Sequence, residues 1–294
     1  MGIHPRSAAQ HHAEIAHAVL REALVKAGIS PREADGVAYS AGPGFGPCLR
    51  VGASVARAIA IMLKKPLTAV HHAIGHIELA IQNTGFADPL TVLVSGGHTA
   101  ILALAGGRWR VYGETEDITL GNLLDTFARG ASLSSPGGPE IERMASGGRE
   151  SIELPYVVKG NDVSYSGILT YALKALKNSR TEDICLSLQE TAFAILVEAT
   201  ERSMVQTGKK EVLLTGGVAM NRRLRELMRS MCESHDVEFG AIRPEFSGDC
   251  GAQISWTGHL ALAYGVAVKP ERSYVKPKWR LDSVDIPWRK QDRS

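Results

Sequence analysis

The sequence predicts an α/β fold, because three patterns follow one another along the chain, of which the first and the third combine strands with a helix and the second consists of strands alone. A strand, a helix and a second strand lie within residues 36–70, three strands within residues 90–113, and a strand that leads through two glycines into a helix within residues 211–232. The first pattern is typical of a parallel crossover and the second of antiparallel strands joined by tight turns. The length of 294 residues allows one large domain or two of ordinary size.

The N-terminal part begins with a predicted helix over residues 7–27. Side chains on one face recur at intervals of three and four residues, namely Ala8, His12, Ile15 and Val19. Gly28 is the expected end of this helix. The parallel crossover follows, with a strand over residues 36–41, a helix of small residues over 49–63 and a strand that ends at Val70.

The pattern changes at residue 89. Three short strands separated by glycine pairs, over residues 90–94, 99–104 and 108–113, predict a β-meander. The later elements are expected as helices over 122–131, 139–145 and 183–206, a strand over 211–215, a helix over 219–232, a strand over 237–241 and a helix over 251–264.

Two glycine loops share one plan, since residues 92–97 and 212–217 each place a hydroxyl and two glycines after three apolar residues. In Ser95-Gly96-Gly97-His98-Thr99, backbone N–H groups can form an anion-binding concavity and the two hydroxyls add donors. The other loop leads to Asn221 at a strand-to-helix junction, where α/β proteins bind anions and nucleosides. The pair therefore suggests two sides of one phosphate or nucleotide cleft. Considered alone, the first loop also fits an ordinary hairpin turn, and the second also fits a tight strand-to-helix turn in which Asn221 is merely solvated.

His72 and His76 are the metal candidates. Two histidines four residues apart on a helix face the same side and can bind one ion through their imidazoles. Ala73 follows His72, so the pattern differs from the HExxH of zinc proteases, which has a glutamate at this position. An acidic third ligand is expected from Asp249, before the last predicted helix, although Asp249 also suits the N-cap of that helix. On its own, a His pair of this spacing is more often structural than a pair of ligands.

The composition, with 44% hydrophobic and 22% charged residues, excludes a disordered tail, a collagen-like repeat and a small disulfide scaffold. No stretch approaches eighteen uninterrupted apolar residues and no signal-peptide pattern opens the chain, so neither a membrane partner nor export is expected. Four cysteines without a CxxC pair are typical of reduced thiols in the cytoplasm, which is the predicted location.

The charge of the C-terminal segment differs from that of the whole chain. The net charge is +2, yet from Lys269 onward eight Lys and Arg residues stand against four Asp and Glu, with Trp279 and Trp288 among them. A basic segment with aromatic side chains can follow a phosphate backbone. The same composition equally fits a solvated tail that two aromatic residues anchor to the domain.

Taken together, the motifs resemble those of the tRNA threonylcarbamoyladenosine synthase family. This family comprises the catalytic subunit of the archaeal and eukaryotic KEOPS complex and its bacterial relative, formerly described as an O-sialoglycoprotein endopeptidase. The matching motifs are Gly2-Ile3-His4-Pro5 with His11-His12-Ala13, Gly42-Pro43-Gly44, His72 with His76, Ser95-Gly96-Gly97-His98-Thr99, Pro136-Gly137-Gly138-Pro139, Ser164-Tyr165-Ser166-Gly167, Gln189-Glu190-Thr191-Ala192-Phe193 and Gly216-Gly217-Val218-Ala219.

The resemblance implies an actin/hexokinase-like (ASKHA) fold, in which two ribonuclease-H-like halves surround a cleft. The implied segments are residues 1–88 for the first half, 89–258 for the second half with its nucleotide-binding loops, and 259–294 for the end of the last helix and a basic tail that returns to the first half. The family transfers a threonylcarbamoyl group from threonylcarbamoyl-AMP to N6 of adenosine 37 in tRNAs that read ANN codons.

The resemblance also implies site residues and partners. His72, His76 and Asp249 would bind one divalent ion, iron or zinc, and no catalytic base is assigned. The residues that would hold the adenylate or an ATP-type nucleotide are Leu93, Val94, Ser95, Gly96, Gly97, Asp125, Gly138, Glu142 and Asn221. From their spacing alone, Asp125 and Glu142 are ordinary helix residues. The implied partners are tRNA and KEOPS-type accessory subunits, including a small kinase/ATPase and a dimerising subunit.

Two departures from the family pattern stand out. Leu93 takes the place of a tyrosine in the archaeal pattern, as in bacterial members, so any tyrosine contribution to the metal is absent. The family opens with a β-meander that carries a glycine-rich phosphate loop, whereas this chain opens at its first helix. We therefore expect a truncated or late-starting chain whose first half lacks those strands and exposes a sheet edge near residues 36–41.

Two other functions remain open at this level. A metal-dependent glycoprotease is supported by the His pair, while the missing glutamate after His72 argues against it. A non-catalytic, nucleotide-binding subunit is the second alternative, because the first half is expected to be incomplete.

Overall fold

The computed structural model describes residues 4–289 and divides into two compact units. Unit 1 comprises Met1–Leu79, Gly106–Arg108 and Cys250–Ser294, and unit 2 comprises Ala80–Ala105 and Trp109–Asp249. The segment boundaries at residues 88 and 258 implied by the resemblance stay a prediction.

Unit 1 contains the predicted parallel crossover. Helix α1 (Pro5–Ala27) is followed by strand β1 (Val37–Gly42), helix α2 (Gly46–Leu63), strand β2 (Leu67–His71) and the start of helix α3 (His72–Thr84). β1 and β2 pair in parallel, with Val37 opposite Leu67 and Ser40 opposite Val70. Gly28 ends α1 with φ 67°, the left-handed conformation that favours glycine, as predicted.

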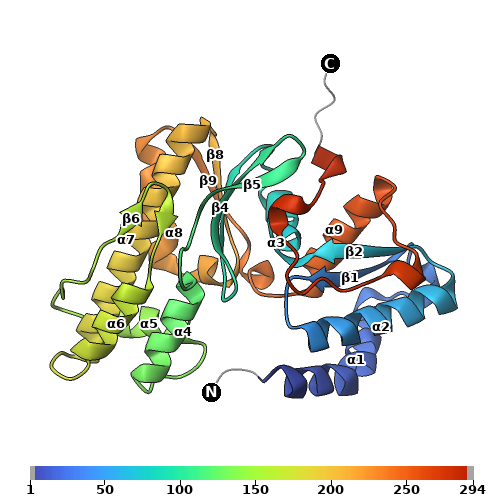
Figure 1. The fold of residues 1–294 in the computed structure, drawn as a ribbon, viewed down its shortest axis with the longest axis horizontal. Helices are drawn as coiled ribbons and strands as arrows, with labels where there is room; N and C mark the ends of the chain where they lie inside the picture. Colours follow the sequence, from blue (N-terminus) through green and yellow to red (C-terminus); the bar gives the residue numbers. More distant parts are fainter. Residues whose placement is uncertain (1–3, 290–294) are drawn as a thin grey trace. The chain divides into compact units, whose positions relative to one another are not determined.

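Helices cover both faces of this two-stranded sheet, as the right-hand part of Figure 1 shows. Tyr39 and Ala41 pack against small residues of α2, whereas Ala38 lies against Gly258 of helix α9 (Gly251–Ala263). Neighbouring residues of a strand point to opposite faces, so this alternation places α2 and α9 on opposite sides of β1. Within residues 4–289, β1 pairs with no strand other than β2.

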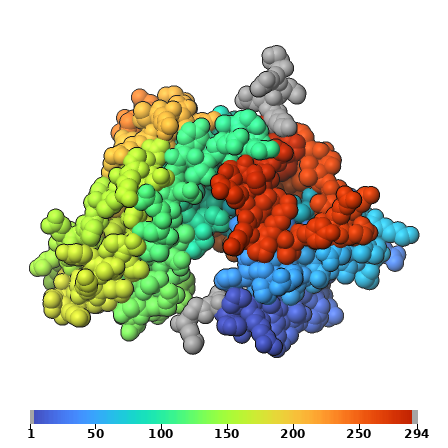
Figure 2. Space-filling view, viewed as in Figure 1, coloured from blue at the N-terminus to red at the C-terminus, as the bar shows by residue number. Residues whose placement is uncertain are grey.

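The C-terminal segment completes the core of unit 1. Val268, Val275 and Trp279 pack against the buried cluster that Tyr39 and α2 form. Figure 2 shows this segment, in red, spread over the blue residues of the N-terminal part. The backbone of Lys276 also donates a hydrogen bond of 2.6 Å to the carbonyl of Ala41, so the segment is tied to the end of β1.

Helix α2 is the one described helix that is long and apolar enough to cross a membrane, with a mean hydropathy of 1.4 over 18 residues. A single helix of this kind is weak evidence for a span, and α2 also carries two arginines. The guanidinium of Arg57 donates to Ser273 Oγ at 2.8 Å and to the Pro270 carbonyl at 3.0 Å. The helix is therefore held by polar contacts to the C-terminal segment of its own unit.

Unit 2 is built on a mixed sheet of five strands in the order β5-β4-β3-β8-β9. The strands are β3 (Leu90–Val94), β4 (Thr99–Ala105), β5 (Arg108–Glu114), β8 (Glu211–Thr215) and β9 (Glu238–Ala241). β3 runs antiparallel to β4 and parallel to β8, and all five of its residues are buried. The predicted meander and the predicted strand at 211–215 are thereby confirmed.

The helices of unit 2 are α4 (Leu120–Gly130), α5 (Gly137–Ala145), α6 (Ser166–Ala175), α7 (Thr181–Thr207) and α8 (Arg222–Ser234), and a short hairpin joins β6 (Val158–Lys159) to β7 (Asp162–Val163). The long α7 contacts α5, α8 and β3 (Figure 1). The prediction of one helix over 219–232 is wrong. A 3-10 turn (Gly217–Met220) precedes α8, because the side chain of Asn221 accepts a hydrogen bond from Leu224 N and so begins the helix at residue 222.

Candidate metal and adenylate sites

The two histidines lie on one face of α3, as their spacing predicts. The helix begins directly after β2, and the rings of His72 and His76 lie 4.9 Å apart with their planes at 89°. His76 is 2% exposed, while His72 is partly exposed. Gln253 of α9 places its Nε2 atom 3.3 Å from His72 Nδ1, so α9 helps to orient the first imidazole.

Asp249 adds a carboxylate to this pair. It is joined by a peptide bond to Cys250, the N-cap of α9, so the alternative role of Asp249 as N-cap of that helix is wrong. One ligand atom each from His72, His76 and Asp249 lie within 4.8 Å of one another. Two imidazole nitrogens and one carboxylate oxygen form a donor set that suits zinc or iron and leaves further coordination positions for other ligands.

The Ser95–Gly97 loop of unit 2 is held by its own side chains. Ser95 Oγ accepts hydrogen bonds from Gly97 N at 3.2 Å and His98 N at 3.0 Å. Thr119, the N-cap of α4, donates to the Gly96 carbonyl at 2.8 Å. A Cβ at Gly96 or Gly97 would meet no atom of the described residues within 4 Å. The two glycines therefore leave open space beside the loop, into which a ligand can approach the backbone.

The second glycine loop lies next to the first. Gly216 has φ 97°, and a Cβ on it would overlap the carbonyl oxygen of Val94 at the end of β3. Because β3 and β8 are parallel neighbours, their carboxyl ends lie at the same edge of the sheet. The two similar segments are therefore adjacent loops, and the phosphate or nucleotide cleft between them stays a prediction.

Three other predicted adenylate residues, Asp125, Glu142 and Asn221, connect the helices of unit 2 to one another. Asp125 Oδ1 accepts a hydrogen bond of 2.8 Å from Gly137 N, which holds the glycines that begin α5 against α4. Glu142 Oε1 accepts from Arg222 N at 2.8 Å, and Asn221 Nδ2 donates to Gln189 Oε1 at 3.0 Å. α4, α5, α7 and α8 are thus tied together through the side chains that the motifs singled out.

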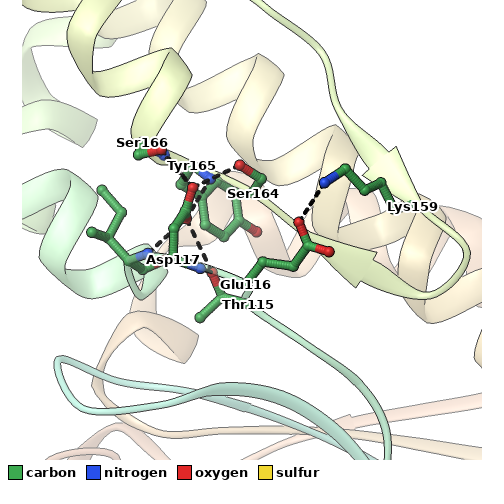
Figure 3. A network of polar contacts seen from close by, with 8 residues as sticks. Thr115, Glu116, Asp117, Lys159, Ser164, Tyr165 and Ser166 are labelled. Carbon is green, nitrogen blue, oxygen red and sulfur yellow. Dashed lines mark hydrogen bonds and ion pairs between the residues drawn. The ribbon is translucent and has the colours of Figure 1, made fainter.

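Asp117 is a polar centre that lies outside every motif of the sequence. Its two carboxylate oxygens accept hydrogen bonds from the hydroxyls of Ser164 and Ser166, both at 2.6 Å, and from the backbone of Tyr165 at 2.9 Å (Figure 3). Partial burial opposes ionisation, but these bonds and that from Ile118 N outweigh it and hold the pKa of Asp117 well below its usual value. Asp117 therefore fixes the turn at residues 164–166 beside the start of α4, whose N-cap holds the glycine loop.

The fold and these sites define an α/β protein with a His-His-Asp candidate metal group and glycine loops suited to a nucleotide. Residues 1–256 match the family model described as tRNA N6-adenosine threonylcarbamoyltransferase. The chain belongs to this family, and it is a transferase of tRNA threonylcarbamoyladenosine biosynthesis.

The curated relatives agree over almost the whole chain. The tRNA N6-adenosine threonylcarbamoyltransferase of Thermofilum pendens is 53% identical over 290 residues, covering 98% of this chain and 86% of the relative. The enzyme of the same name from Methanopyrus kandleri is 52% identical over 297 residues, with the same coverages of 98% and 86%. A probable bifunctional tRNA threonylcarbamoyladenosine biosynthesis protein of Methanosarcina barkeri is 49% identical over 295 residues, which cover 99% of this chain and 54% of that protein.

Solved structures support the fold alone. HypF of T. kodakarensis has a TM-score of 0.64 at 15% identity, over 80% of this chain and 41% of that protein. Full-length HypF in a phosphate- and nucleotide-bound form has a TM-score of 0.60 at 13% identity, over 78% of this chain and 47% of that protein. This chain thus spans less than half the length of either structure. The predicted α/β class is confirmed, with a likeness to proteins of the ASKHA type.

Proposed function

We propose that this chain transfers the threonylcarbamoyl group from threonylcarbamoyl-AMP to N6 of adenosine 37 in tRNAs that read ANN codons. The observation that carries the proposal is that one chain contains both a His-His-Asp group and glycine loops whose surroundings are braced by Asp125, Glu142 and Asn221. The two ribonuclease-H-like halves, with limits at residues 88 and 258, belong to the same proposal.

Different residues of the chain would bind the donor and the metal ion. The loops that end β3 and β8 hold the adenylate end of the donor, because open backbone at Gly96 and Gly97 admits a phosphate and helix N-termini favour negative charge. His72, His76 and Asp249 hold one Fe²⁺ or Zn²⁺ ion, which supplies Lewis acidity toward the carbamoyl carbonyl when bound. The buried His76 and the Gln253 contact orient the two imidazoles before any substrate arrives.

The C-terminal segment is the proposed route for the tRNA backbone. Lys276 Nζ lies 4.1 Å from the centre of the Trp279 ring, and Arg280 beside it is 79% exposed. Such a basic and aromatic surface suits phosphate contacts and base stacking. Lys290 and Arg293, which add to the charge of the segment, lie outside the described residues.

The proposed partners are tRNA and KEOPS-type accessory subunits, including a small kinase/ATPase and a dimerising subunit, and the proposed location is the cytoplasm. The Methanosarcina barkeri relative is named as a bifunctional protein and is about twice as long as the matched segment. This supports the idea that a second activity works with the transferase.

The deciding experiment follows labelled threonylcarbamoyl from its adenylate to a tRNA transcript, using the full chain with accessory subunits and, as control, the same mixture without the adenylate. Transfer that depends on His72 supports the proposal. Absence of transfer together with His72-dependent cleavage of a glycosylated polypeptide would instead support the glycoprotease. Adenylate binding without transfer or cleavage would support the non-catalytic subunit.

A further inference from the structure

The turn that follows β1 in unit 1 packs directly on the C-terminal segment. Gly42 has φ 146°, and a Cβ on it would overlap the carbonyl oxygen of Lys276. Gly44 N donates a hydrogen bond of 3.1 Å to the Pro277 carbonyl. A Cβ at Gly46 would lie 3.4 Å from the Pro277 ring. The glycines of the turn therefore let the two stretches of backbone meet without a side chain between them.

Phe45 is an exposed aromatic residue in the middle of this turn. Its side chain is 53% exposed, and it directly precedes α2. Both of its neighbours, Gly44 and Gly46, are held against Pro277, so the backbone that carries the ring is fixed. An aromatic ring on a fixed backbone can accept a second, stacked ring at a small cost in conformational entropy.

Positive charges lie beside Phe45. Arg50, near the start of α2, is exposed, and its Nη1 atom lies 3.6 Å from the position of a Cβ on Gly46. Lys276 and Lys278, on either side of Pro277, are exposed as well. Two separate parts of unit 1 thus bring three cations to one turn, and a polyanion is the ligand that such a group favours.

The stretches of chain that supply these cations carry no negative charge. Residues 36–50 and 272–281 contain no aspartate or glutamate, and Asp282, which follows, is paired with Arg280. A hollow of about 650 Å³ lies beside the basic side chains, and it is lined by Lys276, Pro277, Lys278, Trp279, Arg280 and Ser283. A basic groove next to an aromatic platform is typical of sites for single-stranded nucleic acid.

Trp279, the other aromatic residue of this surface, is engaged within the protein. Lys276 Nζ lies over its ring, and the His71 ring lies 5.1 Å from it at 60°. His71 Nε2 is also 3.1 Å from the Trp279 carbonyl oxygen. Phe45 has no comparable aromatic or cationic ring contact among residues 4–289. Phe45 is therefore the ring that a base can reach.

The surface lies at the edge of the sheet where the histidines begin. Gly42, the last residue of β1, stands opposite His71, the last residue of β2, and paired strands are about 4.8 Å apart. Helix α3 starts at the next residue, His72. A strand of RNA with one base on Phe45 would therefore have its adjoining nucleotide beside a candidate metal ligand.

We propose that Phe45, Arg50, Lys276 and Lys278 bind an unpaired nucleotide that flanks the target adenosine in the RNA. The base stacks on the Phe45 ring, and the three cations contact the phosphates on either side of it. The strand must be unpaired here, because a base within a duplex has no free face to offer. The inference rests on the proposed function, since it takes an RNA as the acceptor.

The test measures binding to the full chain by fluorescence anisotropy. The probes are a labelled single strand of about seven ribonucleotides, within the length that one such site covers, and the same strand without its bases. Phe45→Ala should weaken binding of the base-bearing strand about tenfold, the order of one stacked base, and leave the abasic strand within about twofold. Phe45→Trp should restore the affinity, because it restores an aromatic face.

The salt dependence separates stacking from charge. Phe45→Ala removes no charge, so the slope of log K against log salt should stay the same. Lys278→Gln should weaken binding of both strands and reduce that slope by about 0.7, the value for one phosphate of a single strand.

The matched control is Tyr264→Ala, which removes an aromatic side chain of similar exposure, 57%, from the same unit. Tyr264 follows the end of α9, where Leu262 lies against Gly36 just before β1 begins, so it is at the opposite edge of the sheet. Binding of both strands should stay within about twofold of the original chain. Circular dichroism and thermal unfolding show that each variant is folded.

The inference is overturned if the original chain binds both strands alike, if the folded Phe45→Ala chain loses affinity for both equally or for neither, or if Tyr264→Ala loses as much. An oligoglutamate peptide that binds with the same dependence on Phe45 would overturn the RNA assignment in favour of an acidic protein partner.

Failure of the inference is distinct from failure of the proposed function. Transfer to tRNA with an unchanged KM for tRNA in the Phe45→Ala chain overturns the stacking site alone. Binding of the strand that depends on Phe45 and on the bases, without any transfer, supports the site and contradicts the transferase.

Discussion

Glu78 and Arg289, which are 211 residues apart in the sequence, form a bidentate ion pair within unit 1. Arg289 Nε lies 2.9 Å from both carboxylate oxygens of Glu78, and a second nitrogen of the guanidinium lies 2.8 Å from one of them. The Glu78 side chain is fully buried and that of Arg289 is 17% exposed. Since Glu78 follows His76 by two residues on α3, this pair ties the C-terminal segment to the helix that carries the histidines.

Replacing Arg289 should therefore destabilise the protein strongly. Arg289→Gln leaves the buried carboxylate of Glu78 without its partner, and we expect a loss of about 3 kcal/mol in the free energy of unfolding. The measurement is denaturant unfolding followed by circular dichroism. Arg108→Gln, which breaks the exposed pair of the same segment with Asp285, is the control and should lose less than about 1 kcal/mol. Equal losses of unfolding free energy in the two variants would contradict the expectation that the buried Glu78–Arg289 pair stabilises the fold more than the exposed pair does.

Gly216 and Gly97 should respond differently to alanine. Gly216→Ala forces a side chain into φ 97° against the Val94 carbonyl, so about 1–3 kcal/mol of stability should be lost from the backbone conformation alone. Gly97→Ala meets no neighbouring atom and should leave the unfolding curve unchanged. If the open space there admits the donor, the same methyl group should weaken AMP binding. A destabilised Gly97→Ala chain would show that the loop is a packed turn.

Asp117 should make the protein sensitive to acid. Because its pKa is lower in the folded chain than the ordinary value of about 3.9, the ionised carboxylate stabilises the fold above about pH 5 and loses this effect as the pH falls below about 4. Asp117→Asn should cost about 1–2 kcal/mol at pH 7 and progressively less toward pH 3. Glu116→Gln is the control, because it removes only an exposed ion pair with Lys159. The difference in unfolding free energy between this variant and the original chain should not shrink toward pH 3 in the way expected for Asp117→Asn. Unfolding curves at several pH values provide the comparison.

His72→Ala should abolish most metal binding and transfer while the fold persists. Removal of one ligand should weaken zinc or iron binding by more than about 100-fold. Gln253→Ala, which removes the contact to His72 Nδ1 together with the side-chain cap at Cys250 N, should weaken it by about 10-fold. Metal content by elemental analysis and thermal unfolding give the two readouts. Unchanged metal content in the His72→Ala chain would refute the assignment of the ligands.

Neutralising the C-terminal segment should weaken tRNA binding and reduce its dependence on salt. For each phosphate that the protein no longer neutralises, the slope of log K against log salt should fall by about 0.7–0.9. The variant carries glutamine in place of Lys276, Lys278 and Arg280, and the control carries glutamine in place of the exposed Arg149, Lys174 and Lys177 of unit 2. Equal weakening in the two variants would point to a general charge effect and away from the proposed route.

The elements with a strong periodic or alternating pattern could be predicted from the sequence. The strand over residues 211–215 has the predicted limits, because its apolar run is bounded by charged residues on one side and by two glycines on the other. The start of α8 at Arg222 was harder to predict from the sequence. An asparagine is compatible with either a continuous helix or a new N-cap, and the hydrogen bond from Leu224 N to the Asn221 side chain decides for the cap.

Functional residues could be predicted where they lie within one helix turn of each other in the sequence. They could not be predicted where their contacts join residues that are far apart in the sequence. His72 and His76 share a helix turn, so their spacing alone brought them together. The turn around Phe45 and the segment around Pro277 come from opposite ends of the chain, and neither carries a local signal for the other. Asp117 likewise shows its role only once the turn at Ser164, 47 residues later, folds back onto it.

The way unit 1 is assembled has a consequence for protein synthesis. Tyr39 donates a hydrogen bond to the carbonyl of Tyr274, which is made 235 residues later, and its aromatic ring is covered by side chains from the same late segment. The ribosome therefore synthesises all of unit 2 before it synthesises Cys250–Ser294, the last segment of unit 1. Until then the apolar cluster of β1 and α2 lacks the side chains of Val268, Val275 and Trp279 that complete it. We therefore expect nascent chains to be prone to aggregation during translation, while unit 2 already has every strand of its own sheet.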